Sequence, residues 1–246
     1  MSERMSSRTE LIVGEEGIGR LESARVVLAG AGAVGGYVLE GLVRAGVGHI
    51  RVIDGDTVSA SNLNRQILAT VDTLGRPKAE AAAERARSIN PAVVVEPVTE
   101  RIVAGTDLAK LIGRPDVIAD AIDTVAGKTA LLSYAAAERI PTFSSMGAAL
   151  RTDPSRIGTA PLGGTRVCPL AAAMRRNLRG MDAGLIACVY SEEPPCAVPV
   201  DRDVFGKSLL GSLPTVPAIF GMTLANGIIM HIVGMDPTPE ADRPSA

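Results

Sequence analysis

A glycine-rich turn between a short apolar run and an amphipathic stretch is the feature that most limits the fold of this chain. The run RVVLAG (residues 25–30) predicts a strand, and Leu39, Leu42 and Val43 then recur at helical spacing. Between them, the glycines of GAGAVG (residues 30–35) let the backbone approach a phosphate at the positive N-terminus of a helix. The pattern favours a nucleotide-binding α/β fold, and a tight turn without a ligand is the alternative.

The alternation of strand and helix continues over the first 150 residues. HIRVID ends a second strand at Asp54, an alanine-rich helix covers residues 78–90, and a short β-branched run follows at 93–95. DVIADAID predicts a fourth strand over 116–123, and another strand is expected at about 142–146 after a helix. We therefore expect a Rossmann-like, doubly wound and mostly parallel sheet with helices on both faces.

The periodicity breaks after residue 150, where prolines and glycines interrupt the sequence. We expect one domain over residues 1–235, with a nucleotide-binding core at about 20–150 and an extension at about 151–235. Residues 236–246 have no apolar content beyond two alanines, which predicts a flexible tail. The apolar stretch at 216–234 contains Pro217, Asn226 and His231, which favours a buried or dimer-facing helix over a membrane span.

Composition excludes several classes of protein. The 246 residues are 46% hydrophobic and 21% charged with a formal net charge of −2, which is typical of a globular protein and not of a disordered one. Aromatic residues make up only 2%, so a surface that stacks single-stranded bases on aromatic rings is not expected. The first ten residues carry charges and no apolar run, so we expect a cytoplasmic protein.

The cysteines and histidines are expected to be structural. Cys168, Cys188 and Cys196 form no C-x-x-C pair, so we expect no zinc, and no nearby pattern supplies a base that would make a catalytic thiolate. His49 and His231 lie in apolar segments and are expected to pack rather than react.

Four charged residues are spaced for binding a nucleotide. Asp54 closes the second predicted strand 19 residues after the last glycine of the turn, where a carboxylate accepts hydrogen bonds from ribose. Arg65 stands among amides in SASNLNRQ and Lys78 opens a helix, and both suit the charge of a triphosphate. Asp123 is expected to end the fourth strand and hold magnesium. A regulatory or redox module that holds NAD is the rival interpretation. Hydride transfer, however, does not require Arg65, Lys78 or Asp123.

The segments GAGAVG, VIDGDTVSASNLNRQ, GRPKAEAAAERARSINP and DAIDT follow one another in an order that resembles the ubiquitin-activating-enzyme-like adenylating proteins, a family that includes sulfur-carrier adenylyltransferases. The resemblance covers about residues 8–234. Most members have Gly where this chain has Ala33, which places a methyl group near the nucleotide.

The resemblance implies roles for individual residues. Asn62 and Arg65 would bind phosphates, Lys78 would contact the α-phosphate during attack, and Asp123 would hold magnesium with ATP; Arg65, Lys78 and Asp123 form the catalytic set. Arg8 precedes the predicted core and would reach the ATP of a dimer partner, unless it is a solvated arginine. The full set expected at the nucleotide is Arg8, Gly30, Gly32, Ala33, Gly35, Asp54, Asp56, Ser61, Asn62, Arg65, Gln66, Lys78, Asp123 and Thr124.

Within this family, RTELIVGEEG, SSMGAALRTDPSRI, VCPLAAAMRRNLR and VYSEEPP resemble the tRNA threonylcarbamoyladenosine dehydratases. That resemblance implies a homodimer in which ATP activates the threonyl carboxylate of the modified adenosine as an acyl-adenylate, and a neighbouring nitrogen of the same base then closes a ring. A sulfur-transfer protein is a further expected partner. The alternative is an adenylyltransferase that acts on the C-terminus of a small sulfur-carrier or ubiquitin-like protein.

A local excess of arginine favours tRNA as the substrate. Residues 151–180 contain six arginines against the single acid Asp153, a net charge of +5. We expect contacts with RNA phosphates, and a solvated helix face is the plainer alternative. The residues predicted to bind RNA are Arg166, Arg175, Arg176 and Arg179.

Overall fold

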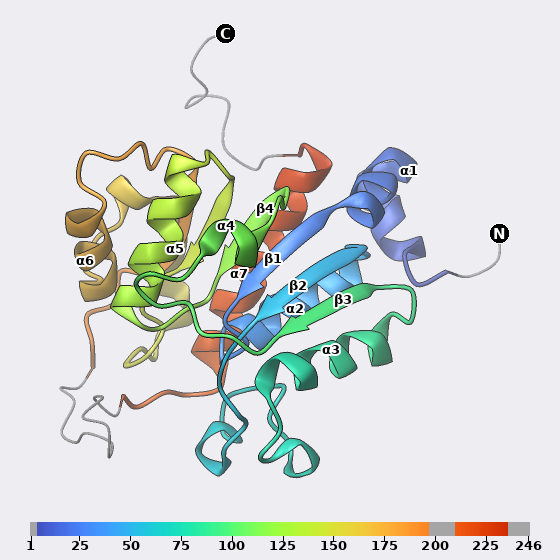
Figure 1. The fold of residues 1–246 in the computed structure, drawn as a ribbon, viewed down its shortest axis with the longest axis horizontal. Helices are drawn as coiled ribbons and strands as arrows, with labels where there is room; N and C mark the ends of the chain where they lie inside the picture. The colour runs from blue at the N-terminus through green and yellow to red at the C-terminus, as the bar shows by residue number, and fades with distance from the viewer. Residues whose placement is uncertain (1–3, 197–209, 236–246) are drawn as a thin grey trace, which may run out of the picture.

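The computed structural model describes residues 4–196 and 210–235, and a seven-stranded sheet forms its centre (Figure 1). The strands lie in the order β3-β2-β1-β4-β5-β7-β6, and each neighbouring pair is parallel except β6 and β7. This confirms the predicted Rossmann-like sheet. The strands are β1 (Arg25–Ala29), β2 (His49–Ile53), β3 (Val94–Val98), β4 (Val117–Asp120), β5 (Thr142–Ser145), β6 (Ile157–Pro161) and β7 (Ile186–Ser191).

Helices cover both faces of the sheet, because residues of the central strands alternate between two apolar layers. In β1, Val26 and Leu28 pack with α1, α2, α3 and α7, whereas Val27 and Ala29 pack with α4 and α5. α6 extends the second layer over β7. The helices are α1 (Ser7–Ser23), α2 (Gly35–Ala45), α3 (Lys78–Ile89), α4 (Leu108–Ile112), α5 (Val125–Ala137), α6 (Pro169–Asn177) and α7 (Thr215–Val233).

The apolar C-terminal stretch forms α7, which is the one helix among the described residues that is long and apolar enough to cross a membrane. It is a core helix instead. Val216, Phe220, Leu224 and Ile228 are buried in the layer that α7 shares with α1 and α2. The prediction of a buried helix is therefore confirmed.

Two boundaries differ from the sequence prediction. β4 ends at Asp120, so the prediction that Asp123 ends this strand is wrong; the N–H of Ile122 donates to Asp120 Oδ1 at 3.1 Å, and this local bond turns the chain out of the sheet. Arg8 lies inside α1, a helix that we did not predict, so it does not precede the folded part. The predicted flexible tail at 236–246 lies outside the described residues.

A buried ion pair joins β4, α5 and β5. Lys128 Nζ lies 2.6 Å from Asp120 Oδ2, and both side chains are fully buried. The hydroxyl of Ser144 donates to the same carboxylate oxygen at 2.6 Å and accepts from Lys128 Nζ at 3.3 Å. Because each charge is satisfied by the other, removing one of them leaves an uncompensated charge in the interior.

We predict that Lys128→Met lowers the free energy of unfolding by about 3–5 kcal/mol, because the Asp120 carboxylate keeps its burial and loses its cation. Urea unfolding followed by circular dichroism measures this. The matched control is the double variant Lys128→Met/Asp120→Asn, in which both charges are gone and the amide still accepts from Ile122. The double variant should be more stable than the single one, and the opposite order would contradict a role for charge compensation.

Candidate active site

A cleft of about 1340 Å³ opens where the parallel strands end. Its lining comes from the segments that follow β1, β2, β3, β4 and β5, together with parts of α6 and the chain before α7. This is the edge of an open α/β sheet at which ligands bind, beside the point where successive strand connections pass to opposite faces. In Figure 1 the helices α4 and α5 stand on one side of this edge and α2 on the other.

The glycine-rich turn forms one wall of the cleft. Gly30 has φ +94°, a conformation that favours glycine, and a Cβ there would lie 2.8 Å from the carbonyl oxygen of Ala121. A Cβ on Gly35 would lie 1.8 Å from the carbonyl oxygen of Gly30. The two glycines therefore let α2 start directly against the end of β1. Gly30, Gly32 and Ala33 line the cleft, whereas Gly35 serves the close packing behind it.

Asp54 lies at the end of β2, beside the turn, as predicted. Its Oδ2 accepts from the N–H of Ala31 at 2.7 Å and its Oδ1 from the N–H of Asp56 at 2.8 Å. Burial raises the pKa of Asp54 above the usual aspartate value of 3.8, although the two N–H groups and Lys78 act in the opposite direction. The carboxylate is held in one orientation in the lining of the cleft, where it can accept further hydrogen bonds.

Lys78 begins α3 and lines the cleft. The side chain is only 8% exposed, and Nζ lies 3.2 Å from Asp56 Oδ2. Asp56 also pairs with Arg101, whose Nη2 lies 2.5 Å from Oδ1. Both cations line the cleft with Asp56 between them, and Arg101 is a lining residue that the sequence analysis missed.

The loop after β2 brings Arg65 to the cleft but not Asn62. Asn62 is buried and caps the 3-10 helix Ala60–Asn62, since its Oδ1 accepts from the N–H of Ser59 at 3.0 Å. Arg65 Nη1 donates to the carbonyl of Ser61 at 2.7 Å and to Asn64 Oδ1 at 2.8 Å. The predicted residues Ser61, Arg65 and Gln66 line the cleft, and Asn64 takes the lining position in place of Asn62.

Asp123 and Thr124 line the cleft from the loop between β4 and α5. In the described part of the chain, no three His, Cys, Asp or Glu side chains gather as metal ligands. Arg8 is not among the lining residues of its own chain. Its predicted role across a dimer interface stays a prediction.

The remaining part of the cleft, which we call the acceptor half, is mostly apolar. Residues 145–151, 168–170 and 210–212 supply most of its wall. Arg151 is the cation of this wall, and it was singled out in the sequence only as part of the arginine excess. Its place in the cleft depends on β5 lying beside β4, which spacing along the chain does not reveal.

The three cysteines lie in different surroundings. Cys188 is buried in β7, and desolvation raises the pKa of its thiol to about 12. Cys168 lines the cleft, where its sulfur accepts a hydrogen bond of 3.4 Å from the N–H of Gly147. Cys196 is exposed.

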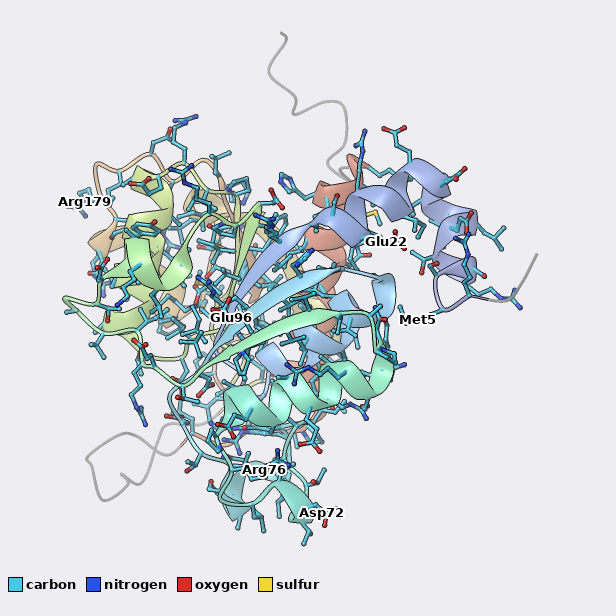
Figure 2. All side chains as sticks on the ribbon, turned by 45° about the vertical axis from the view of Figure 1, so that its right-hand side comes forward. Met5, Glu22, Asp72, Arg76, Glu96 and Arg179 are labelled. Carbon is cyan, nitrogen blue, oxygen red and sulfur yellow. The ribbon has the colours of Figure 1, made fainter. Side chains whose placement is uncertain are left out.

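The predicted RNA-binding arginines divide into two kinds. Arg175 is half-buried and donates to the carbonyl and hydroxyl of Thr165, and Arg166 pairs with Glu192 at 3.5 Å. Arg176 and Arg179 are exposed, and Figure 2 places Arg179 at the outer edge of the molecule. Leu170 and Ala173, earlier on α6, line the cleft, so this helix leads from the cleft towards the exposed arginines.

Comparisons with known proteins agree with this geometry. The chain is 35% identical to tRNA threonylcarbamoyladenosine dehydratase 2 of Saccharomyces cerevisiae over 89% of its length, and it spans about half (54%) of that relative. It is 33% identical to the Bacillus subtilis tRNA threonylcarbamoyladenosine dehydratase, covering 92% of this chain and 94% of the relative. The crystal structure of the Escherichia coli tRNA N6-threonylcarbamoyladenosine dehydratase in complex with ATP superposes with a TM-score of 0.84, 31% identity and 94% coverage of each chain.

A sequence model described as the ThiF family matches residues 6–244, which is nearly the whole chain. The glycine turn, the carboxylate after β2 and the lysine that opens α3 all fall inside this match and on one cleft. The protein therefore belongs to the ThiF family.

Proposed function

We propose that this chain is an ATP-dependent enzyme that adenylates the threonyl carboxylate of threonylcarbamoyladenosine in tRNA, so that the modified base closes into its cyclic form. The observation that carries this proposal is one cleft with two parts: a charged part lined by Asp54, Asp56, Arg65, Lys78 and Arg101, which we call the nucleotide half, and the mostly apolar acceptor half. The similarity to dehydratases over most of the chain supports the choice of substrate.

The chain's own residues provide the contacts that ATP requires. Asp54 would accept hydrogen bonds from the ribose hydroxyls, because each of its oxygens keeps a free lone pair. The backbone of the glycine turn faces the phosphates at the N-terminus of α2. Lys78 and Arg65 would neutralise phosphate charge, and Lys78 has three donors, so it can bind a phosphate oxygen while it keeps Asp56.

Asp123 is the residue that we propose for magnesium. Magnesium is commonly held by one or two carboxylates together with substrate phosphates, and one cleft-lining aspartate fits this arrangement better than it fits a complete protein-made metal site. When bound, the ion would neutralise charge on the departing pyrophosphate.

The reaction needs little from the side chains beyond positioning and charge. A carboxylate oxygen of the substrate bonds to the α-phosphorus as the bond to pyrophosphate breaks. The neighbouring nitrogen then bonds to the acyl carbon, its proton passes to solvent, and AMP leaves. The nucleophile belongs to the same modified base, so its effective concentration is high. The raised pKa of Cys188 agrees with a mechanism that uses no cysteine nucleophile there.

The oligomeric state of the enzyme is a further part of the proposal. We propose a homodimer, which exposed apolar side chains of α1 support: Leu11 is 79% exposed and Ile12 is 72% exposed. A cytoplasmic location, the absence of zinc and a sulfur-transfer protein partner stay predictions from the sequence.

We predict that Lys78→Ala and Asp123→Ala fold normally but release pyrophosphate about 10²–10³-fold more slowly, since each removes charge aimed at the reacting phosphates. Pyrophosphate release with ATP, magnesium and tRNA that carries the modified base measures this. Lys110→Ala is the matched control, because Lys110 is an exposed lysine of α4 outside the cleft lining. Unchanged pyrophosphate release from either cleft variant would refute its assignment.

We predict that ATP binding is sensitive to acid through Asp54. The folded pKa is raised, so protonation begins at a higher pH than for an ordinary aspartate, and the protonated carboxyl accepts ribose hydrogen bonds less well. Asp54→Asn should bind ATP about tenfold more weakly at neutral pH, and its difference from the unaltered protein should shrink as the pH falls through the raised pKa. Titration calorimetry over a pH series measures both proteins, and the comparison cancels the titration of ATP itself. A ratio of affinities that does not change with pH contradicts the role of Asp54.

We predict that Arg176→Gln/Arg179→Gln weakens tRNA binding and leaves ATP affinity unchanged. Each lost phosphate contact should reduce the slope of log K against log salt by roughly one. Filter binding at several salt concentrations measures this, and Arg114→Gln is the control, since Arg114 is an exposed arginine of the loop before β4, outside α6 and the segment that follows it. If both proteins bind tRNA like the unaltered chain, this face does not bind RNA, and a small carrier protein becomes the better candidate acceptor.

A further inference from the structure

Arg151 is a buried cation whose charge lacks a partner within residues 4–196 and 210–235. The residue is 3% exposed, and Nε has no hydrogen-bond partner. Nη1 makes one long hydrogen bond, of 3.3 Å, to the carbonyl of Leu150. Burying a guanidinium group costs free energy unless an anion or several acceptors surround it. The arrangement therefore indicates an anionic ligand.

Neighbouring carboxylates are engaged elsewhere. The buried carboxylate of Glu193 accepts from the N–H and hydroxyl of Thr152, at 2.9 and 2.8 Å, and from the N–H of Asp153 at 2.9 Å. These bonds, that of Asp153 first, lower the pKa of Glu193. Asp153 accepts from Ser155 and pairs with Arg156 at 3.3 Å. Glu193 thus anchors the residues that follow Arg151 and gives Arg151 no ion pair.

Leu150, the residue before Arg151, is also held in place by hydrogen bonds. Leu150 has φ +59°, a left-handed conformation that is costly for a leucine and persists only where the surrounding structure fixes it. Its N–H donates to the carbonyl of Gly211 and its carbonyl accepts from the N–H of Cys196, both at 3.0 Å. Arg151 is consequently fixed from both sides before any ligand arrives, as expected of a pre-organised binding residue.

We propose that Arg151 binds the carboxylate that the enzyme adenylates, by donating from Nε and the adjacent guanidinium nitrogen. This inference rests on the proposed function. Arg151 belongs to the acceptor half, whose other wall residues are mostly small or apolar, whereas Lys78 and Arg65 serve the nucleotide half. A planar guanidinium matches a carboxylate in a bidentate pair, and the apolar surroundings strengthen that pair.

Burial decides between the carboxylate and the RNA backbone. At 3% exposure, Arg151 is accessible to the narrow side arm of a modified base that enters the cleft, but not to phosphates that stay on the surface of a folded tRNA. Each carboxylate oxygen keeps a lone pair when it accepts from the guanidinium, so the bound group can still attack the α-phosphorus.

The test compares Arg151→Gln with Arg156→Gln, a matched control in the same segment whose arginine is 53% exposed and pairs with Asp153. Binding is measured for tRNA that carries threonylcarbamoyladenosine and for the same tRNA without that modification, both with a non-hydrolysable ATP analogue. ATP affinity and the melting temperature are measured alongside. Arg151→Gln should lose at least about tenfold of the preference for the modified tRNA, with unchanged affinity for unmodified tRNA and ATP.

Two further readouts separate binding from a structural role. The melting temperature of Arg151→Gln should not fall, because the variant removes a buried charge that has no ion pair among the described residues. Arg151→Lys should recover part of the preference, since it keeps the charge but not the planar pair of donors.

Three results for Arg151→Gln would overturn the inference. An equal loss of affinity for both tRNAs would indicate that Arg151 binds RNA phosphates, and a loss of ATP affinity would indicate that it binds nucleotide phosphates. An unchanged preference for the modified tRNA would show that Arg151 does not bind the carboxylate. If the unaltered protein does not convert the modified tRNA, the proposed function fails and the inference fails with it. If the unaltered protein converts the tRNA and Arg151→Gln keeps the preference, only the inference fails.

Discussion

The buried pair of Lys128 and Asp120 is the interaction on which the geometry of the cleft depends. Two opposite charges without solvent must stay in contact, so β4, α5 and the end of β5 are fixed relative to one another. The same Asp120 turns the chain through its bond to Ile122, and the residues just beyond this turn line the cleft. Asp120 and Lys128 do not line the cleft themselves, but they fix the position of the cleft-lining segment that contains Asp123 and Thr124.

The cleft combines two environments that the proposed reaction needs together. The nucleotide half concentrates charge, with Asp56 held between Lys78 and Arg101, so cations are in place before phosphates arrive. The acceptor half is poor in charged side chains, and an apolar wall strengthens electrostatic interactions beside it. Because an intramolecular nucleophile closes the ring, the protein gains more from rigid placement than from reactive side chains.

The sequence predicted those features of the fold and the site that are encoded locally. The glycine turn, Asp54 and the start of α3 at Lys78 each follow from neighbours in the chain, and the alternation of strand and helix predicted the sheet. The choice between similar residues close in sequence was not predicted. Asn62 and Asn64 look alike in the sequence, but Asn62 caps a short helix through the N–H of Ser59, whereas the amide of Asn64 donates to the carbonyl of Ser212, far along the chain.

The sequence also did not predict which arginines are exposed and which are buried. Arg175, Arg176 and Arg179 form one charged cluster in the sequence, yet Thr165, brought close by the preceding loop, takes Arg175 out of the exposed group. Arg151 counted as one more charge in that excess, and the sequence does not show that its chain neighbours bond to residues about forty and sixty positions away, Asp153 to Glu193 and Leu150 to Gly211.

An unpaired buried arginine is also a means of selecting substrates. A site that is built to pair with a substrate group rejects analogues that lack the group, because the site's own polar atoms are then left desolvated and unpaired. An unmodified adenosine that enters the acceptor half would leave Arg151 without an anion, whereas the modified base supplies one. Backbone hydrogen bonds of Leu150 and Asp153 hold the main chain on both sides of Arg151, so the residue is positioned before the substrate enters. Selectivity for the modified base would then come from the ion pair that only its carboxylate can form with Arg151.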